Sequence, residues 1–280
     1  MPSEKRQRQD EGRLLRLEAE RVAATRSQRS RQVRSIGVLI GAIVLVALAI
    51  SIFSGDDDGG DVSTEGTGGT TTTVAEGAAV SIPIPAAGAT IEGDTTCPAA
   101  DGSAERTTTF AKAPPTCIDP AKTYTAVLET SEGDITIELD TLNAPVTANS
   151  FVVLARYHYF DGVAFHRIVP GFVNQAGDAV GPTPGVGGPG YTLPDELPAD
   201  PLTAYTAGAV AMANSGADSG GSQFFLVIGD ENGSLSGTGA YTVFGHVTAG
   251  QEVSEAINLL AVGESPTKVV TIDSVTITES

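Results

Sequence analysis

The chain of 280 residues has few of the Cys and His side chains that bind zinc. It contains no Trp, two Cys and three His, and its 16 Lys and Arg stand against 34 Asp and Glu. The cysteines, Cys97 and Cys117, have no ligand-like spacing with the histidines, His158, His166 and His246. Without the histidines, two cysteines are too few for a four-ligand zinc site. We therefore expect no metal site.

Positive charge is also scarce beyond the first residues. Residues 1–35 hold ten of the 16 Lys and Arg and five of the acids, a balance of +5. Residues 36–280 hold six and 29, a balance of −23. This asymmetry suggests different compartments or partners for the two parts. The basic stub 1–35 contains acids and lacks interleaved aromatics, so we expect attraction to anionic lipid and no nucleic-acid binding.

Only one long hydrophobic run is present, IGVLIGAIVLVALAISIF at residues 36–53. Its 18 uncharged residues are near the lower limit for a helix that crosses a bilayer. Arg residues precede the run and Asp residues follow it, which predicts a cytoplasmic N-terminus and an extracytoplasmic remainder. A cleaved signal peptide is the alternative, but its charged and apolar regions would both be unusually long. We predict a single-pass protein of the cell membrane.

Three further parts follow the predicted membrane helix. Residues 54–80 are rich in Gly, Thr and Asp, which indicates a flexible linker. Residues 81–121 form a Pro- and Thr-rich lead-in that contains both cysteines. Since export is expected, we predict a Cys97–Cys117 disulfide. Residues 122–280 have the patterning of a folded domain.

Alternation and turn residues predict the elements of that domain. TYTAVLET (123–130) and DITIEL (134–139) alternate on either side of Ser131-Glu132-Gly133, a hairpin signal. Pro145 precedes a helical run at 146–157, and a second helix is expected at 254–262. VAFHRIV (163–169) is expected to be a strand. About eight strands and two helices predict an all-β dominated fold, a closed eight-stranded antiparallel barrel capped by two helices.

Four motifs occur in order along the domain. They are FHRIVPGFVNQAGD (165–178), GGPGYTLPDE (187–196), VAMANSGADSGGSQFFLV (210–227) and YTVFGHV (241–247). In these motifs the chain resembles the cyclophilin family of peptidyl-prolyl cis/trans isomerases, over about residues 122–279. The lead-in and linker are similar to those of membrane-anchored actinobacterial members. The resemblance implies a cyclophilin-like barrel and an isomerase that needs no cofactor.

The chemistry of prolyl isomerisation fits the first motif. An X-Pro bond interconverts over a barrier of roughly 18–20 kcal/mol, which arises from amide resonance. In the twisted state the prolyl nitrogen becomes a hydrogen-bond acceptor, so a guanidinium aimed at it lowers the barrier. Arg167 is a lone cation among apolar residues and is the candidate for this task. A side chain that merely reaches into water is the alternative reading of this one residue.

The resemblance assigns roles to further residues. Phe172 and Gln175 join Arg167 as catalytic residues, with Gln175 binding the substrate carbonyl and helping to hold the Arg. The implied substrate-binding residues are Val173, Ala213, Asn214, Gln223, Phe225, Leu235 and Tyr241. Strand alternation would place His166 on the opposite face to Arg167, so we expect it to be a buried structural residue.

Two positions depart from the family pattern. Many cyclophilins carry a Trp at the pocket rim just before the position of Leu235, and this chain has none. The loop 234–241 is about three residues longer than the common form, and Tyr241 replaces a His that is often found beside the pocket. The missing indole puts tight cyclosporin binding in doubt.

We predict a membrane-tethered prolyl isomerase that acts outside the cytoplasm on proline-containing polypeptides that are unfolded or newly exported. We expect a monomer. Two alternatives remain: a non-catalytic peptide-binding or chaperone module with nearly the same pocket, and a structural adaptor for an envelope assembly. The retained Arg167 favours catalysis.

Overall fold

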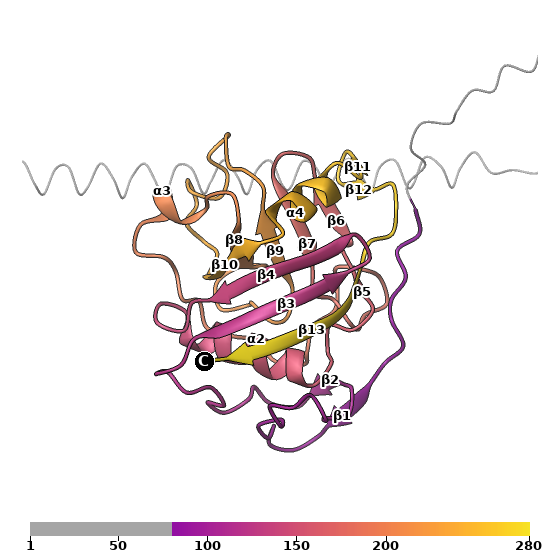
Figure 1. Ribbon diagram of the computed structural model, residues 1–280, viewed down its shortest axis with the longest axis vertical. Helices are drawn as coiled ribbons and strands as arrows, with labels where there is room; N and C mark the ends of the chain where they lie inside the picture. The colour runs from indigo at the N-terminus through magenta and orange to yellow at the C-terminus, as the bar shows by residue number, and fades with distance from the viewer. Residues whose placement is uncertain (1–79) are drawn as a thin grey trace, which may run out of the picture. The chain divides into compact units, whose positions relative to one another are not determined.

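One curled antiparallel sheet organises residues 80–280, the part of the chain that the structure, a computed structural model, describes (Figure 1). Its nine strands are β3 Tyr124–Thr130, β4 Gly133–Leu139, β5 Val163–Ala164, β6 Arg167–Val169, β7 Val173–Ala176, β8 Ala209–Met212, β9 Phe224–Val227, β10 Val243–Ala249 and β13 Thr271–Glu279. They lie in the order β5–β13–β3–β4–β10–β8–β9–β7–β6. The predicted hairpin is confirmed as β3 and β4.

The sheet corrects the prediction of a closed eight-stranded barrel. Among residues 80–280 it has nine strands, and its edge strands β5 and β6 do not pair with each other. The cause is a break in VAFHRIV, which we expected to be one strand. Its first part pairs with β13 and its last part with β7, so the two parts form opposite ends of the sheet. Between them the Phe165 N–H donates to Val270 O at 2.9 Å.

Within residues 80–280, three helices accompany the sheet: α2 Pro145–Arg156, α3 Pro201–Ala204 and α4 Gln251–Asn258. Pro145 stands in the first turn of α2, as the sequence predicted, because it needs no N–H acceptor there. Helix α4 starts three residues before the expected 254, after Gly250 with a φ of 79°. It also ends before the expected 262, because Ala261 and Val262 form the short strand β11, paired with β12 Ser265–Pro266.

The predictions for residues 1–79 (the basic stub, the membrane helix and nearly all of the linker) lie outside the described residues. Within residues 80–280 no helix is long and apolar enough to cross a membrane.

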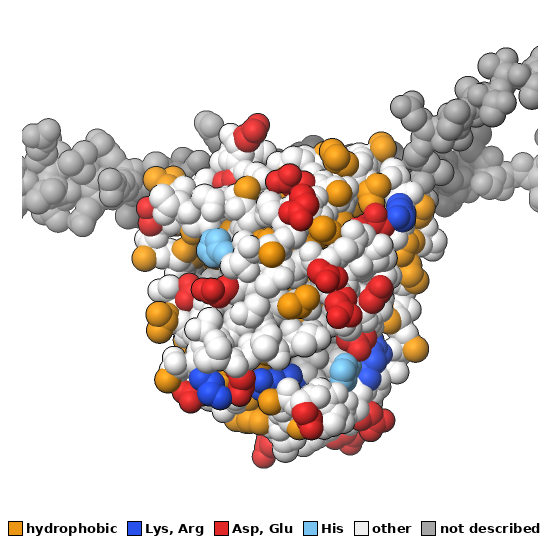
Figure 2. Space-filling model, in the orientation of Figure 1, with side chains coloured by type: hydrophobic (Ala, Val, Ile, Leu, Met, Phe, Trp, Pro, Cys, Tyr) orange, Lys and Arg blue, Asp and Glu red, His pale blue; other side chains and the backbone are white. Residues whose placement is uncertain are grey.

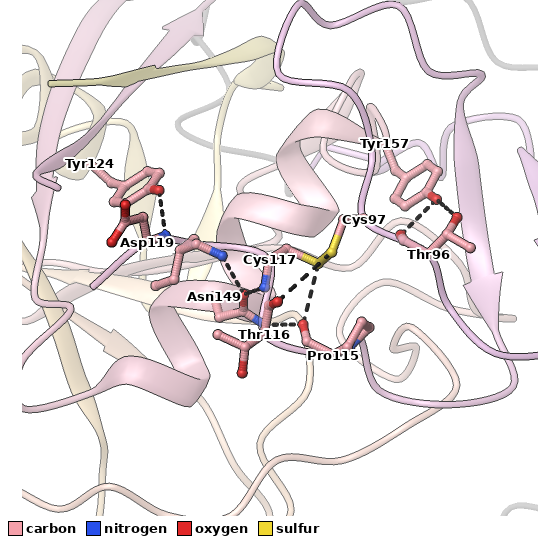
Figure 3. Close-up of a disulfide and its surroundings, with 10 residues drawn as sticks. Thr96, Cys97, Pro115, Thr116, Cys117, Asp119, Tyr124, Asn149 and Tyr157 are labelled. Atoms are coloured by element: carbon pink, nitrogen blue, oxygen red, sulfur yellow. Dashed lines mark hydrogen bonds between the residues drawn. A yellow bond between two sulfur atoms is a disulfide. The ribbon is translucent and has the colours of Figure 1, made fainter. Parts of the chain in front are cut away.

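The lead-in is fixed to the domain at several points. Strand β1 Ala89–Ile91 pairs in parallel with β2 Thr107–Phe110, and the predicted Cys97–Cys117 disulfide is present (Figure 3). Asn149 of α2 accepts the backbone N–H groups of Cys117 and Ile118 at 2.7 and 3.2 Å. The N–H of Phe110 donates to Pro189 O at 2.8 Å. The lead-in therefore packs on both α2 and the loop that contains Pro189.

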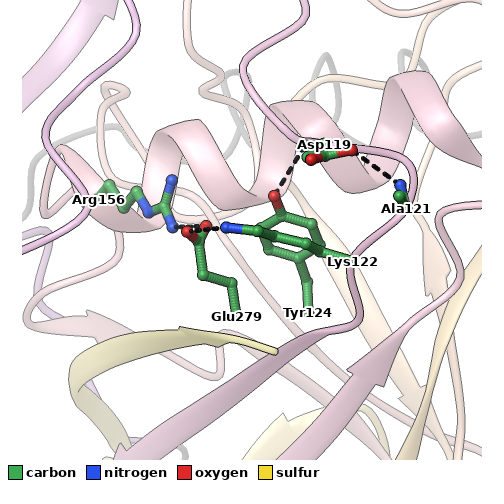
Figure 4. Close-up of polar contacts among 6 residues, drawn as sticks. All are labelled: Asp119, Ala121, Lys122, Tyr124, Arg156 and Glu279. Atoms are coloured by element: carbon green, nitrogen blue, oxygen red, sulfur yellow. Dashed lines mark hydrogen bonds and ion pairs between the residues drawn. The ribbon is translucent and has the colours of Figure 1, made fainter.

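The C-terminal strand is tied down by charge. Glu279 of β13 accepts hydrogen bonds from Arg156 and Lys122, both at 2.8 Å (Figure 4). These cations are two of only six among residues 80–280, against 23 Asp and Glu. Acidic side chains are scattered over the face that β3, β4 and β13 form, with few basic ones (Figure 2).

Candidate functional site

Strand alternation gives the sheet two apolar cores. Phe224 and Leu226 of β9 belong to the main core together with Ile168, whereas Phe225 and Val227 belong to a smaller one. Members of the smaller core are Val173, Tyr205, Ala209, Ala211, Phe225, Val227, Leu235 and Val243. Since successive residues of a strand face opposite sides, the smaller core lies on the face of the sheet that does not contact the main core.

On that face the strand register places Arg167, Gln175 and Phe225 in one row. Arg167 of β6 pairs with Gln175 of β7, and Gln175 pairs with Phe225 of β9. Directly paired residues of antiparallel strands share a face and stand close together. A guanidinium, an amide and an aromatic ring that are far apart in the sequence are thus neighbours.

A cavity of about 380 Å³ opens over this row. Its lining contains nine of the ten residues to which the resemblance gave catalytic or substrate-binding roles: Arg167, Phe172, Val173, Gln175, Ala213, Asn214, Phe225, Leu235 and Tyr241, with Ser234 in addition. Phe225 and Leu235 are each 4% exposed. The Phe225 and Tyr241 rings pack edge-on, with 5.3 Å between their centroids. The cavity is suited to a small apolar ring held beside a cation.

The tenth residue, Gln223, lies in an adjoining cavity of about 530 Å³. This cavity shares Gln175, Ala213 and Asn214 with the first, and the segment 185–189 forms part of its lining. The two cavities therefore form one groove in which an extended peptide has room on one side of the ring site.

Arg167 has a partner that the sequence did not indicate. Its Nε donates to Glu264 Oε2 at 2.8 Å, and this hydrogen bond, with the positive charge of Arg167, lowers the pKa of Glu264. Gln175, expected to help hold the Arg, instead donates from Nε2 to Gln223 Oε1 at 3.1 Å. Gln223 in turn donates to Gly187 O at 2.9 Å. The amides of Gln175 and Gln223 thus link β7 to the groove wall.

The wall that carries Leu235 is held by half-buried hydrogen bonds. Asp230 accepts the N–H groups of Leu235 at 2.9 Å and Ser236 at 2.8 Å. Burial acts to raise the pKa of Asp230, but these hydrogen bonds outweigh it and the pKa is lowered. The Tyr205 hydroxyl donates to Tyr241 O at 2.7 Å and accepts the Tyr241 N–H at 3.1 Å. Hydrogen bonds therefore hold the loop between Asp230 and Tyr241 at both ends.

His166 lies outside both cavity linings and is half-buried. Its ring packs near Gly185, where an added Cβ would lie 3.0 Å from His166 Cδ2. Burial lowers the pKa of His166, and its Nδ1 has no hydrogen-bond partner among residues 80–280. The structural role expected for His166 stays a prediction.

Sequence reasoning missed Glu264, Asp230, Tyr205 and Ser234. Asp230 precedes Asn232-Gly233, so a turn anchored by its carboxylate was a readable local signal. Glu264 gave no such signal, because 97 residues separate it from Arg167. Within residues 80–280 no group of three or more His, Cys, Asp or Glu is arranged to hold a metal.

Comparisons with known proteins agree on one family. The family described as cyclophilin type peptidyl-prolyl cis-trans isomerase/CLD matches residues 125–277. Peptidyl-prolyl cis-trans isomerase B of Bacillus subtilis is 46% identical over 121 residues, which cover 43% of this chain and 80% of that protein. The probable peptidyl-prolyl cis-trans isomerase A of Mycobacterium bovis is 38% identical over 177 residues, covering 56% of this chain and 94% of that one. A solved Cryptosporidium parvum cyclophilin type isomerase is similar with a TM-score of 0.50 and 26% identity, over 56% of this chain and 99% of that one.

Proposed function

The chain belongs to the cyclophilin-type peptidyl-prolyl cis-trans isomerase family, and from this we propose that it accelerates rotation about X-Pro bonds by means of Arg167. The single observation that carries the proposal is the row of Arg167, Gln175 and Phe225 beneath one cavity. Substrates are proline-containing polypeptides, as the family's activity requires.

The groove gives each part of the substrate a place. The proline ring enters the cavity that Phe172, Phe225 and Leu235 line, where burial removes its apolar surface from water. The residues before the proline extend toward Gln223 in the adjoining cavity. A fixed ring restricts rotation to the carbonyl side of the bond.

Arg167 acts on the twisted state. In planar cis or trans amides the prolyl nitrogen shares its lone pair with the carbonyl and accepts hydrogen bonds poorly. At the twisted geometry the lone pair is localised, and a guanidinium N–H can donate to it. The interaction is stronger in the transition state than in either ground state, which is the condition for catalysis. Each 1.36 kcal/mol of this preference is worth about tenfold in rate.

The proposal includes an extracytoplasmic site of action on unfolded or exported chains. Two features support it: the uncharged run 36–53 with Arg residues before it and Asp residues after it, and the Cys97–Cys117 disulfide, a bond typical of oxidising compartments. The membrane tether, the cytoplasmic N-terminus and the monomeric state belong to this proposal. Digestion of spheroplasts with a membrane-impermeant protease tests it. A domain that is protected from the protease would contradict export.

Activity is tested by exchange NMR on an X-Pro peptide with the full chain and its Arg167→Ala variant. We expect enhanced exchange that falls at least tenfold in the variant, because the donor to the prolyl nitrogen is lost. Lys112→Ala is the matched control, since Lys112 is an exposed cation paired with Asp94 and outside both cavities. Exchange at the uncatalysed rate with the wild-type protein, with peptide still bound, would favour the alternative of a non-catalytic peptide-binding module. Enhanced exchange that is equal in the wild-type protein and Arg167→Ala would refute the role of Arg167.

A further inference from the structure

Glu264 contacts β6 at two consecutive residues. Its carboxylate accepts the Nε–H of Arg167 at 2.8 Å, and its backbone carbonyl accepts the N–H of Ile168 at 3.3 Å. Side chain and backbone of one acid thus fix both the guanidinium and the strand that carries it. β6 is the edge strand of the sheet, and β7 is its one neighbour there within residues 80–280. The contact with Glu264 therefore supplies support on its open side.

The backbone of Glu264 is itself well held. It lies in the two-residue turn between β11 and β12, after Gly263 with a φ of 64°, a conformation that Gly adopts without strain. Thr267 closes the base of this hairpin through two hydrogen bonds to Leu260 O, at 2.7 Å from N and 2.9 Å from Oγ1. The carboxylate is consequently presented from a constrained hairpin.

Glu264 approaches Arg167 from the side away from the ring site. Arg167 lines both the 380 Å³ cavity and another of about 460 Å³, whereas Glu264 lines only the latter. The bond also uses Nε, the guanidinium nitrogen nearest the stem, which leaves both terminal amino groups for a substrate. A long Arg side chain that is 36% exposed has many accessible rotamers. Anchoring Nε reduces them without occupying the donors that catalysis needs.

We propose that Glu264 is the positioning residue of this isomerase, which holds the Arg167 guanidinium in the orientation that serves the twisted prolyl nitrogen. The inference rests on the proposed function of Arg167. Among residues 80–280, the side-chain hydrogen bond of Arg167 goes to Glu264, and that of Gln175 goes from Nε2 to Gln223. The carboxylate acts through Arg167 and makes no contact with the reacting bond.

A negative charge beside the guanidinium could also oppose catalysis by weakening its donors. Two features decide whether removal of the Glu264 carboxylate raises or lowers the rate. Glu264 is 64% exposed, so water screens its charge at the distance of the terminal amino groups. The orienting hydrogen bond is a geometric constraint, and screening does not remove it. Loss of the carboxylate should therefore lower the rate.

The test compares Glu264→Ala and Glu264→Gln in the full chain, with kcat and KM measured on an X-Pro peptide. We expect Glu264→Ala to lower kcat about fivefold with KM within twofold. The hydrogen bond from Glu264 orients the Arg167 guanidinium, and that orientation is needed mainly when the prolyl bond is twisted. Glu264→Gln keeps an oxygen that can accept from the Arg167 Nε–H, so this variant should retain most of the wild-type kcat. The matched control is Glu231→Ala, which removes an acid from the lining of the same 460 Å³ cavity and should leave kcat unchanged.

A double-mutant cycle separates this inference from the function on which it rests. If Glu264 acts through Arg167, adding Glu264→Ala to Arg167→Ala causes no further loss. An Arg167→Ala variant with full activity would overturn both proposals. A large loss in Arg167→Ala, together with unchanged or raised kcat in Glu264→Ala, would overturn the positioning role alone. An equal loss in Glu264→Ala and Glu231→Ala would also overturn it, as would a thermal midpoint that falls in parallel with kcat.

Discussion

Glu279 provides the sharpest prediction for the stability of the domain. Its carboxylate joins the end of β13 to Arg156, in the last turn of α2, and to Lys122, which precedes β3 (Figure 4). Arg156 is only 8% exposed, and its Nε has no acceptor among residues 80–280. Glu279→Gln would keep the size of the side chain and remove the charge that faces this guanidinium.

The pKa of Glu279 sets an upper limit on the effect. Hydrogen bonds from Lys122 and Arg156 lower that pKa from 4.5 to about 2. A shift of this size corresponds to at most about 3 kcal/mol. The Glu279 side chain is 30% exposed and Lys122 is 43% exposed, so solvent screens much of it. The variant also leaves the buried Arg156 guanidinium without its anion, which adds to the loss of stability. We expect Glu279→Gln to lower the free energy of unfolding by about 1–2 kcal/mol at pH 7.

The pH dependence follows from the direction of the shift. A carboxylate whose folded pKa is depressed contributes stability above its unfolded pKa, and this stability is lost as pH falls through the folded pKa. The difference between wild type and Glu279→Gln should therefore be full at pH 7 and shrink from about pH 5 downward toward pH 2. Urea denaturation at pH 7, 5 and 3 measures it. Asp94→Asn removes an exposed pair with Lys112 and is the control. A pH-independent difference, or one as small as the control's, would refute the reasoning.

Two further predictions concern the groove wall and the lead-in. Asp230→Ala should raise KM for an X-Pro peptide about threefold to tenfold with little change in kcat, because the charge-assisted bonds to Leu235 and Ser236 that shape the ring site are lost; an unchanged KM would contradict this. Replacing Cys97 and Cys117 by Ser opens a loop of 20 residues and should lower the free energy of unfolding by about 3 kcal/mol. Equal urea midpoints for the oxidised protein and the double Ser variant would show that the disulfide contributes nothing.

Elements with strong local signals were predictable. The β3–β4 hairpin follows from alternation around Ser131-Glu132-Gly133, and α2 from Pro145 and a helical stripe. The disulfide followed from the cysteine count and the expected compartment. The closed barrel was wrong because sequence patterning cannot show that the strand breaks at Phe165 and His166, which leaves β5 and β6 as the two edge strands of the sheet. Strand closure depends on pairing between distant segments, which no local pattern encodes.

The site divides in the same way. The sequence by itself determined the family, the lone Arg167 among apolar residues, and nine residues that line one cavity. It did so because a motif keeps its residue types in order whatever surrounds it. Only the tertiary structure decided what holds Arg167. Glu264 instead of Gln175 takes its Nε, since the β11–β12 turn returns to β6 after 97 residues. Hydrogen-bond partners are selected by proximity in space, and that proximity exists only once the sheet has formed.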